Sequence, residues 1–254
     1  MNSVLERILS SGVVSDGTNE ITVRHPEFPD RISHVDRSTG ELLQRAVREV
    51  KPSLSLEVGL AYGVSTLFIC EAISGLPQPG RHIVLDPYQH GKWRGLGLRI
   101  LRDAGFEALL EFHPEPSELF LPRLLAEGRV LDLVFIDGLH RFEQAFVEFY
   151  YVNRLLRPGG IVLFDDAARR SVKRVIRHAL TYPAYEVYGS TESAAGGPSW
   201  LGRLRRMGGR VPALRRILRP DVLERDWELG VLGRCVALRK VAEDQRPTHW
   251  DSDF

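Results

Sequence analysis

Between residues 51 and 189 the chain alternates short apolar runs with segments of helical period. The apolar runs are LSLEVG (54–59), RHIVLD (81–86), FEALLEF (106–112), LDLVFID (131–137), GIVLFDD (160–166) and AYEVYG (184–189). The segments between them predict helices at 63–74, 94–104, 117–127, 139–156 and 169–180. Apolar strands separated by helices are typical of a parallel sheet that is covered on both faces. With a last strand at 235–241, CVALRKV, the pattern predicts a doubly wound α/β domain with a mostly parallel, seven-stranded sheet.

Acidic residues stand at the ends of several of these strands. Glu57 lies near the end of the first strand and Asp86 ends the second. Asp137 ends the fourth strand, and the fifth ends on the pair Asp165 and Asp166. In an open parallel sheet these ends share one edge, where ligands of such folds bind. We therefore expect the acidic side chains to meet at one rim.

A glycine-rich turn, EVGLAYGVST (57–66), joins the first strand to the first helix. Gly59 and Gly63 allow a tight turn and a close approach of a ligand to the backbone, and Ser65 lies at a helix N-terminus that favours an anion. The spacing G-x-x-x-G without lysine differs from dinucleotide and P-loop motifs. Asp86 stands where an acidic side chain binds ribose hydroxyls. The two features indicate a nucleoside ligand without phosphates, and the alternative is a plain strand-to-helix turn.

The three carboxylates Asp137, Asp165 and Asp166 would repel one another at one rim unless a cation neutralised them. Mg²⁺ prefers oxygen ligands and keeps several waters, so these side chains suit a divalent metal site. The alternative is that Asp165 and Asp166 cap the helix near 169 and that Asp137 takes part in a turn.

Four blocks of the sequence together resemble a known family. In this order and spacing, EVGLAYGVST, VLDPY, LDLVFIDGLH and LLRPGGIVLFDD resemble the class I S-adenosylmethionine-dependent methyltransferases, in particular the metal-dependent small-molecule O-methyltransferases of the catechol and macrocin type. The resemblance covers roughly residues 50–190. It implies a Rossmann-like methyltransferase fold, S-adenosyl-L-methionine as methyl donor and Mg²⁺ or Mn²⁺ as metal.

The resemblance also assigns roles to single residues. It implies a cofactor site that comprises Glu57, Gly59, Gly63, Ser65, Asp86 on the ribose, Ser117 on the adenine, and Asp137. For Ser117 the alternative is a helix N-cap.

The resemblance implies in addition that Asp137, Asp165 and Asp166 hold the metal. It makes Asp137 and His140 catalytic, with His140 at the place of a lysine general base. A histidine pKa near ~6.5 suits proton abstraction at neutral pH. The alternative for His140 is a histidine that only hydrogen-bonds the loop.

The composition limits the setting of the protein. A formal net charge of +1 gives no overall attraction to nucleic acid or to an anionic membrane. Cys70 and Cys235 lie in apolar contexts that are typical of buried thiols in a reducing compartment. Glu6 and Arg7 interrupt the start of the chain where a signal peptide is apolar, and no run approaches the ~18 apolar residues of a membrane span. We expect a soluble, cytoplasmic protein with no membrane partner.

Four parts are expected along the chain. Residues 1–50 form an N-terminal helical lid that ends in a helix at about 38–50, residues 51–189 and 231–243 form the methyltransferase core, residues 190–230 form an arginine-rich helical insert, and residues 244–254 form a flexible tail. Within the insert, arginines and apolar residues at 201–219 predict amphipathic helices with a basic face. That face is open to interpretation as a solvated surface, a contact in a homo-oligomer, or a site for an acidic substrate or an RNA.

The expected activity is transfer of a methyl group to a hydroxyl oxygen of a sugar, polyketide or phenolic natural product in secondary metabolism. One alternative is an RNA or nucleotide methyltransferase that uses the insert. The absence of an Asn-Pro-Pro-Tyr-like block after the fourth strand disfavours it, so we expect no nucleic-acid partner. Another alternative is a cofactor-binding protein without catalytic activity.

Overall fold

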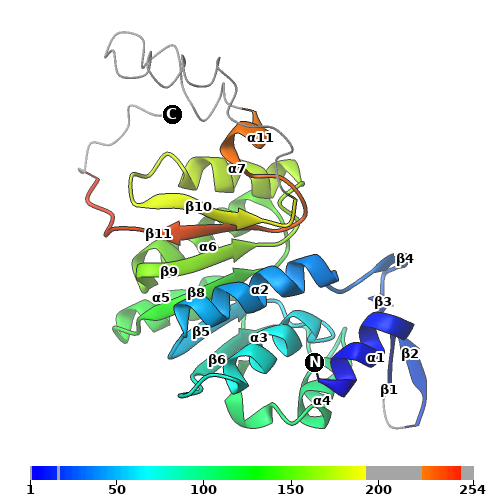
Figure 1. Cartoon of the computed structure of the whole chain (residues 1–254). Coiled ribbons are helices and arrows are strands. Elements are labelled where there is room, and N and C mark those ends of the chain that lie inside the picture. The colour runs from blue at the N-terminus through cyan, green and yellow to red at the C-terminus, as the bar shows by residue number, and fades with distance from the viewer. Residues whose placement is uncertain (1, 16–17, 193–224, 247–254) are drawn as a thin grey trace.

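A twisted seven-stranded sheet forms the centre of the molecule (Figure 1). The computed structural model describes residues 2–15, 18–192 and 225–246. The strand order is β10-β11-β9-β8-β5-β6-β7, and β11 alone runs antiparallel to its neighbours in this sheet. The strands are β5 (Leu54–Val58), β6 (Arg81–Leu85), β7 (Leu110–His113), β8 (Leu131–Ile136), β9 (Leu156–Phe164), β10 (Tyr185–Ser190) and β11 (Val236–Lys240). The predicted mostly parallel, seven-stranded fold is confirmed.

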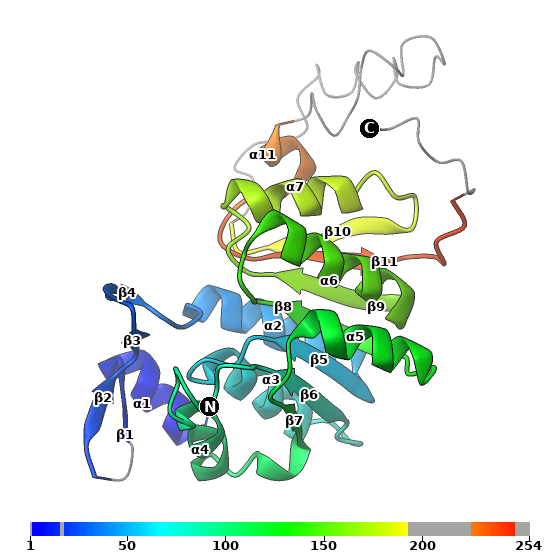
Figure 2. The ribbon, with the colours of Figure 1, turned by 180° about the vertical axis from the view of Figure 1, so that it is seen from behind.

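Helices cover both faces of this sheet (Figures 1 and 2). One face carries α2 (Arg37–Val50), α3 (Val64–Ser74) and α4 (Leu96–Asp103), and the other carries α5 (Ser117–Ala126), α6 (Phe142–Leu155) and α7 (Arg170–Ala179). Successive side chains of a strand point to opposite faces. In β8, Phe135 therefore packs into the core under α2 and α3, while Val134 packs into the core under α6. Both positions have to be apolar, which explains the unbroken hydrophobic run.

The first 36 residues contain more than the predicted helices. After α1 (Ser3–Ser11), the chain forms two small antiparallel sheets, β1 (Val13–Ser15) with β2 (Glu20–Thr22) and β3 (Arg24–His25) with β4 (Phe28–Ile32). The hydroxyl of Tyr62, in the turn after β5, donates to the carbonyl of Arg24 at 2.9 Å. The N-terminal segment therefore contacts the edge of the sheet where the parallel strands end. Helix α2 packs on α3 in the core.

The third predicted strand is partly wrong. Of FEALLEF (106–112), the stretch Glu107–Leu109 forms a 3-10 turn, η1, and only Leu110–His113 forms strand β7. A short apolar run has no periodicity that separates a helical turn from a strand. Here the chain needs the turn to leave α4 and reach the edge of the sheet. Most of the predicted insert (193–224) and the end of the tail (247–254) lie outside the described residues, while α11 (Asp226–Leu229) lies in the last part of the insert.

The direction of β11 has a consequence for the rim. Because β11 is antiparallel to β9, its first residues lie beside the last residues of β9, with Val236 opposite Phe164. The amide of Ala167 donates to the carbonyl of Arg234 at 2.7 Å. Residues that precede β11 therefore reach the edge at which the parallel strands end.

Candidate functional site

The glycine turn after β5 is fixed by its close approach to β8. Gly59 has φ +95°, and a Cβ there would lie 2.2 Å from the backbone oxygen of Asp137. Gly63, with φ +75°, precedes α3, whose start carries no side-chain cap. The first amides of a helix have no partner within the helix. The turn therefore presents unpaired backbone donors that suit an anion.

Glu57 points into the interior rather than to the rim. Its carboxylate is completely buried and accepts hydrogen bonds from the hydroxyls of Ser65 and of Thr66, the latter at 2.6 Å. His82 Nε2 lies 3.1 Å from the same carboxylate. Glu57 and Ser65 thus join the end of β5 to the first turn of α3. In this arrangement they shape the predicted cofactor turn from the interior.

Asp86 lies beside the turn, as the sequence predicted. Its Oδ2 accepts from the amides of Leu60 at 3.2 Å and Ala61 at 2.9 Å, and its Oδ1 accepts from the amide of Tyr88 at 2.8 Å. The carboxylate is almost fully buried. Asp86 therefore fixes the turn and stands at its side, where Oδ1, which accepts from one amide alone, still has a lone pair for a further donor.

Ser117 is the first residue of α5, and the N-cap is Pro116, so the interpretation of Ser117 as a cap is wrong. Its hydroxyl donates to Oε1 of Glu148 at 2.7 Å and accepts from Nε2 of Gln144 at 2.9 Å. Glu148, which is buried on the inner face of α6, was not found from the sequence. Burial raises the pKa of its carboxyl group to about 7. The signal was a lone carboxylate at a position whose helical neighbours, Ala145 and Val152, are apolar and buried.

The predicted acidic rim is formed in part, without Glu57, whose carboxylate is turned to the interior. The amide of Asp137 donates to Val58 in β5 at 2.9 Å, and the amide of Asp165 donates to Ile136 in β8 at 3.0 Å. These bonds continue the sheet by one residue on each strand, so the carboxylates come side by side. Asp137 is partly exposed and Asp165 is 1% exposed. Burial, with the charges of Asp165 and Glu57, raises the pKa of Asp137 well above its ordinary value.

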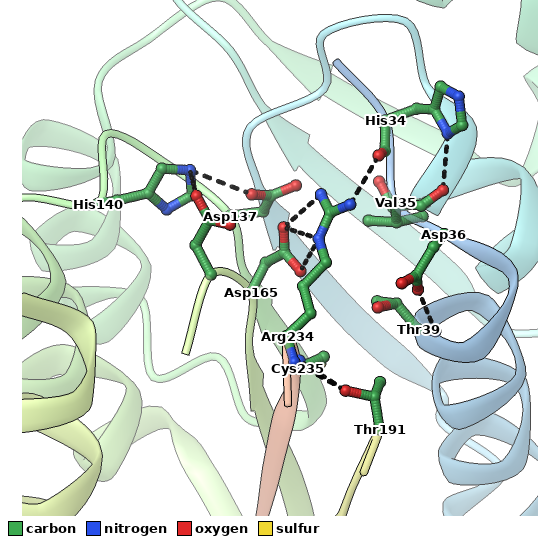
Figure 3. A network of polar contacts seen from close by, with 12 residues as sticks. His34, Val35, Asp36, Thr39, Asp137, His140, Asp165, Thr191, Arg234 and Cys235 are labelled. Atoms are coloured by element: carbon green, nitrogen blue, oxygen red, sulfur yellow. Dashed lines mark hydrogen bonds and ion pairs between the residues drawn. The ribbon is translucent and has the colours of Figure 1, made fainter. Parts of the chain in front are cut away.

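Arg234 supplies the positive charge at this rim, and sequence reasoning missed it. Its Nε lies 3.2 and 3.3 Å from the two oxygens of Asp165, and its Nη2 lies 3.0 Å from Oδ2 (Figure 3). Its Nη1 donates to the carbonyl of His34 at 3.1 Å. The arginine stands 69 residues after its partner, directly before Cys235 and β11, so no local pattern connects the two.

His140 stands between the two other carboxylates of the rim. Its Nε2 lies 3.6 Å from Oδ1 of Asp137 and 3.5 Å from Oδ2 of Asp166. The backbone that carries the ring is anchored, because the hydroxyl of Ser171 donates to the carbonyl of His140 at 2.6 Å. Burial lowers the pKa of His140, which favours the neutral ring with an acceptor nitrogen. Asp166, with φ +50°, also pairs with Arg169.

The predicted metal site is not formed by these residues. In the part of the chain that the structure describes, no group of three or more His, Cys, Asp or Glu side chains is arranged to hold a metal ion. Asp165 is turned to Arg234 and Asp166 to Arg169, so two of the three expected ligands already have a cationic partner. The donor set of Asp137, Asp165 and Asp166 therefore does not fit Mg²⁺ or Mn²⁺ in this arrangement.

Comparisons with known proteins point to one class. Residues 56–167 match the family described as "Methyltransferase domain". The "Transmembrane O-methyltransferase homolog" of Mus musculus is 28% identical over 157 residues, which cover 61% of this chain and 59% of the relative. "Caffeoyl-CoA O-methyltransferase" of Stellaria longipes is 29% identical over 131 residues, 50% of this chain and 51% of the relative. The chain thus spans between half and three-fifths of the length of these curated relatives.

A solved structure agrees with this class at the level of the fold. The O-methyltransferase TomG from Streptomyces achromogenes, solved in complex with S-adenosylmethionine, superposes with a TM-score of 0.57 and 20% identity over 75% of this chain and 85% of that chain. Among the described residues there is no helix of the length and apolar character needed to cross a membrane.

Proposed function

We propose that the chain is a class I S-adenosylmethionine-dependent methyltransferase of the O-methyltransferase type. In this role it transfers a methyl group to a hydroxyl oxygen of a small molecule. The observation that carries the proposal is the meeting of two sets of groups at one edge of the sheet. The uncapped start of α3 and Asp86 form one set, and Asp137 with His140 forms the other.

The first set suits the donor. S-adenosylmethionine supplies a sulfonium methyl carbon that an oxygen attacks in line, with release of S-adenosylhomocysteine. The amides at the start of α3 bind its amino-acid carboxylate, because a helix N-terminus favours negative charge. Asp86 accepts from the ribose hydroxyls, and Ser117 lies at the adenine end. Gly59 and Gly63 give the turn the positive-φ conformation that brings its backbone to this site.

The second set suits proton removal from an acceptor. His140 is held neutral by burial, so Nε2 takes the proton of the hydroxyl as the oxygen attacks the methyl carbon. The electrons of the carbon–sulfur bond pass to sulfur while the new oxygen–carbon bond forms. Asp166 flanks the ring, and its charge stabilises the imidazolium that results. These residues act without any step through a metal ion, because the donor set does not fit one.

We take the acceptor to be a sugar, polyketide or phenolic hydroxyl of secondary metabolism, in a cytoplasmic enzyme. The N-terminal segment, which contacts the rim through Arg24 and His34, serves as the cover of the site. The arginines at 203–219 of the insert fall outside the described residues, so no observation favours RNA as the acceptor.

An acceptor-dependence assay tests this function. We expect purified protein to release S-adenosylhomocysteine from S-adenosylmethionine only when catechols, phenolic glycosides or related hydroxyl compounds are added, with methylated product seen by mass spectrometry. His140→Ala is expected to lower kcat by about 10² or more at pH 7 and to recover partly at higher pH, where a phenol ionises without a base. Turnover that responds to RNA or amines but to no hydroxyl compound contradicts the proposal.

A further inference from the structure

The ion pair between Arg234 and Asp165 is part of the interior rather than a surface contact. Asp165 is 1% exposed, and its two oxygens accept from Nε and Nη2 of the same guanidinium. A buried carboxylate is stable only when a counter-charge and hydrogen bonds accompany it. In the described residues this counter-charge comes from the chain itself.

Three segments hold Arg234 in place. Its backbone amide donates to Oγ1 of Thr191 at 2.9 Å, after β10, and its carbonyl accepts from Ala167 at 2.7 Å, after β9. Its Nη1 donates to the carbonyl of His34, in the N-terminal segment (Figure 3). A side chain fixed at both its backbone and its tip stays near the rim, as a bound cation does.

The guanidinium of Arg234 lies on the side of Asp165 that faces the other residues of the rim. A divalent ion bound by Asp165 and Asp137 would lie within a few ångströms of the Arg234 charge, and the repulsion at that distance is large in a partly buried site. Arg169, which pairs with Asp166, adds a second positive charge that repels a cation. Two fixed positive charges therefore stand against three carboxylates before any ion arrives.

We propose that Arg234 takes the place of a divalent metal ion at this rim, so that the protein binds its ligands without Mg²⁺ or Mn²⁺. The consequence for catalysis rests on the proposed methyltransferase function, but the consequence for metal binding does not. Five N–H groups belong to a guanidinium, and the contacts with Asp165 and His34 use three of them. The remaining N–H groups, on a side chain that is one-third exposed, are available to an acceptor oxygen.

Metal titration tests the proposal on the whole chain. Mn²⁺ is added to EDTA-treated, dialysed wild type and to Arg234→Met, and free Mn²⁺ is followed by electron paramagnetic resonance. We expect no one-to-one binding to wild type, and binding at least about tenfold tighter in the variant because a repelling unit charge is gone. Arg234→Gln, which keeps a donor for Asp165, is the second variant if Arg234→Met does not fold. Arg157→Ala is the matched control, because it removes an arginine–aspartate pair at the opposite edge of the sheet and should gain no Mn²⁺ site.

Two results overturn the proposal. One is stoichiometric Mn²⁺ binding by wild type with an affinity equal to that of the variant. The other is the absence of Mn²⁺ binding in folded Arg234→Met or Arg234→Gln, because the rim is then no cation site at all. Calorimetry with S-adenosylhomocysteine on the same samples keeps the two proposals apart. Binding that requires Mg²⁺ contradicts the arginine inference, whereas no binding with or without Mg²⁺ contradicts the methyltransferase function alone.

Discussion

At the scale of single residues, burial raises the pKa of two carboxyl groups, Asp165 and Glu148, whose partners differ. Asp165 faces the guanidinium of Arg234, whereas Glu148 accepts, within the described part of the chain, from the hydroxyl of Ser117 and the amide of Gln144. Neutral donors stabilise a buried charge less than a cation does. Burial therefore raises the pKa of Glu148 to about 7, and the group is close to half-protonated at neutral pH.

This difference predicts a pH dependence of stability. The pKa of Glu148 is higher in the folded than in the unfolded protein, so its favourable contribution is complete at about pH 4 and is lost as the pH rises through about 7. Glu148→Gln removes this loss. Relative to wild type, the free energy of unfolding of the variant should rise by up to about 3 kcal/mol between about pH 5 and pH 8.

Urea unfolding at the two pH values measures this change. Glu143→Gln, exposed on the same helix, is the control and should show no such trend. A difference between Glu148→Gln and wild type that is the same at both pH values contradicts the assignment of the pKa to Glu148.

A second residue-scale prediction concerns Asp86. Asp86→Ala leaves the amides of Leu60, Ala61 and Tyr88 without their acceptor, so both the turn and the ribose contact should suffer. We expect a loss of about 2 kcal/mol in stability and a loss of affinity for S-adenosylhomocysteine of more than about tenfold. Calorimetry and thermal unfolding report the two effects. Asp103→Ala, on the surface of α4, should change neither, and unchanged cofactor affinity in Asp86→Ala contradicts the ribose assignment.

At the scale of elements, the close approach of β5 and β8 governs the turn. Gly59→Ala would bring a Cβ to 2.2 Å from the backbone oxygen of Asp137 at a φ of +95°. We expect it to cost about 3 kcal/mol of stability, because backbone rather than a flexible side chain has to move. Gly105→Ala is the matched control, since Gly105 has φ +80° but nothing within 4 Å of the added Cβ, and it should cost only about 1 kcal/mol. Equal losses for the two variants, measured by urea unfolding, contradict this account of the turn.

The sequence predicts most elements because their patterns are local. Strand β8 is apolar and buried from Leu133 to Ile136, and the aspartate that follows it marks the rim in the sequence itself. The run at 106–112 fails because so short a segment does not separate a 3-10 turn from an edge strand.

Local sequence patterns also find some residues of the site and miss others. Asp137, Asp165 and His140 are found from sequence because each closely follows a strand, but Glu148 and Arg234 are not. Arg234 reaches the rim only because β11 runs antiparallel between β9 and β10, and the direction of a strand is not written in its hydrophobic pattern.

At the scale of the whole molecule, the charge balance of the rim explains how acids can gather there in a chain of net charge +1. The three carboxylates follow β8 and β9, and the cations come from the segment before β11 and from the start of α7. The sequence predicts a divalent metal ion for these acids, whereas in the structure Arg234 and Arg169 pair with two of them. The N-terminal segment joins the same network through the carbonyl of His34.

We propose that this edge of the sheet binds S-adenosylmethionine, and that it does so beside a fixed arginine rather than a metal ion. The most direct test is isothermal titration calorimetry of EDTA-treated wild-type protein with S-adenosylhomocysteine, repeated in Mg²⁺. We expect one-to-one binding with the same affinity in both buffers. Binding in neither buffer contradicts the cofactor site, and binding in Mg²⁺ alone contradicts the role given to Arg234.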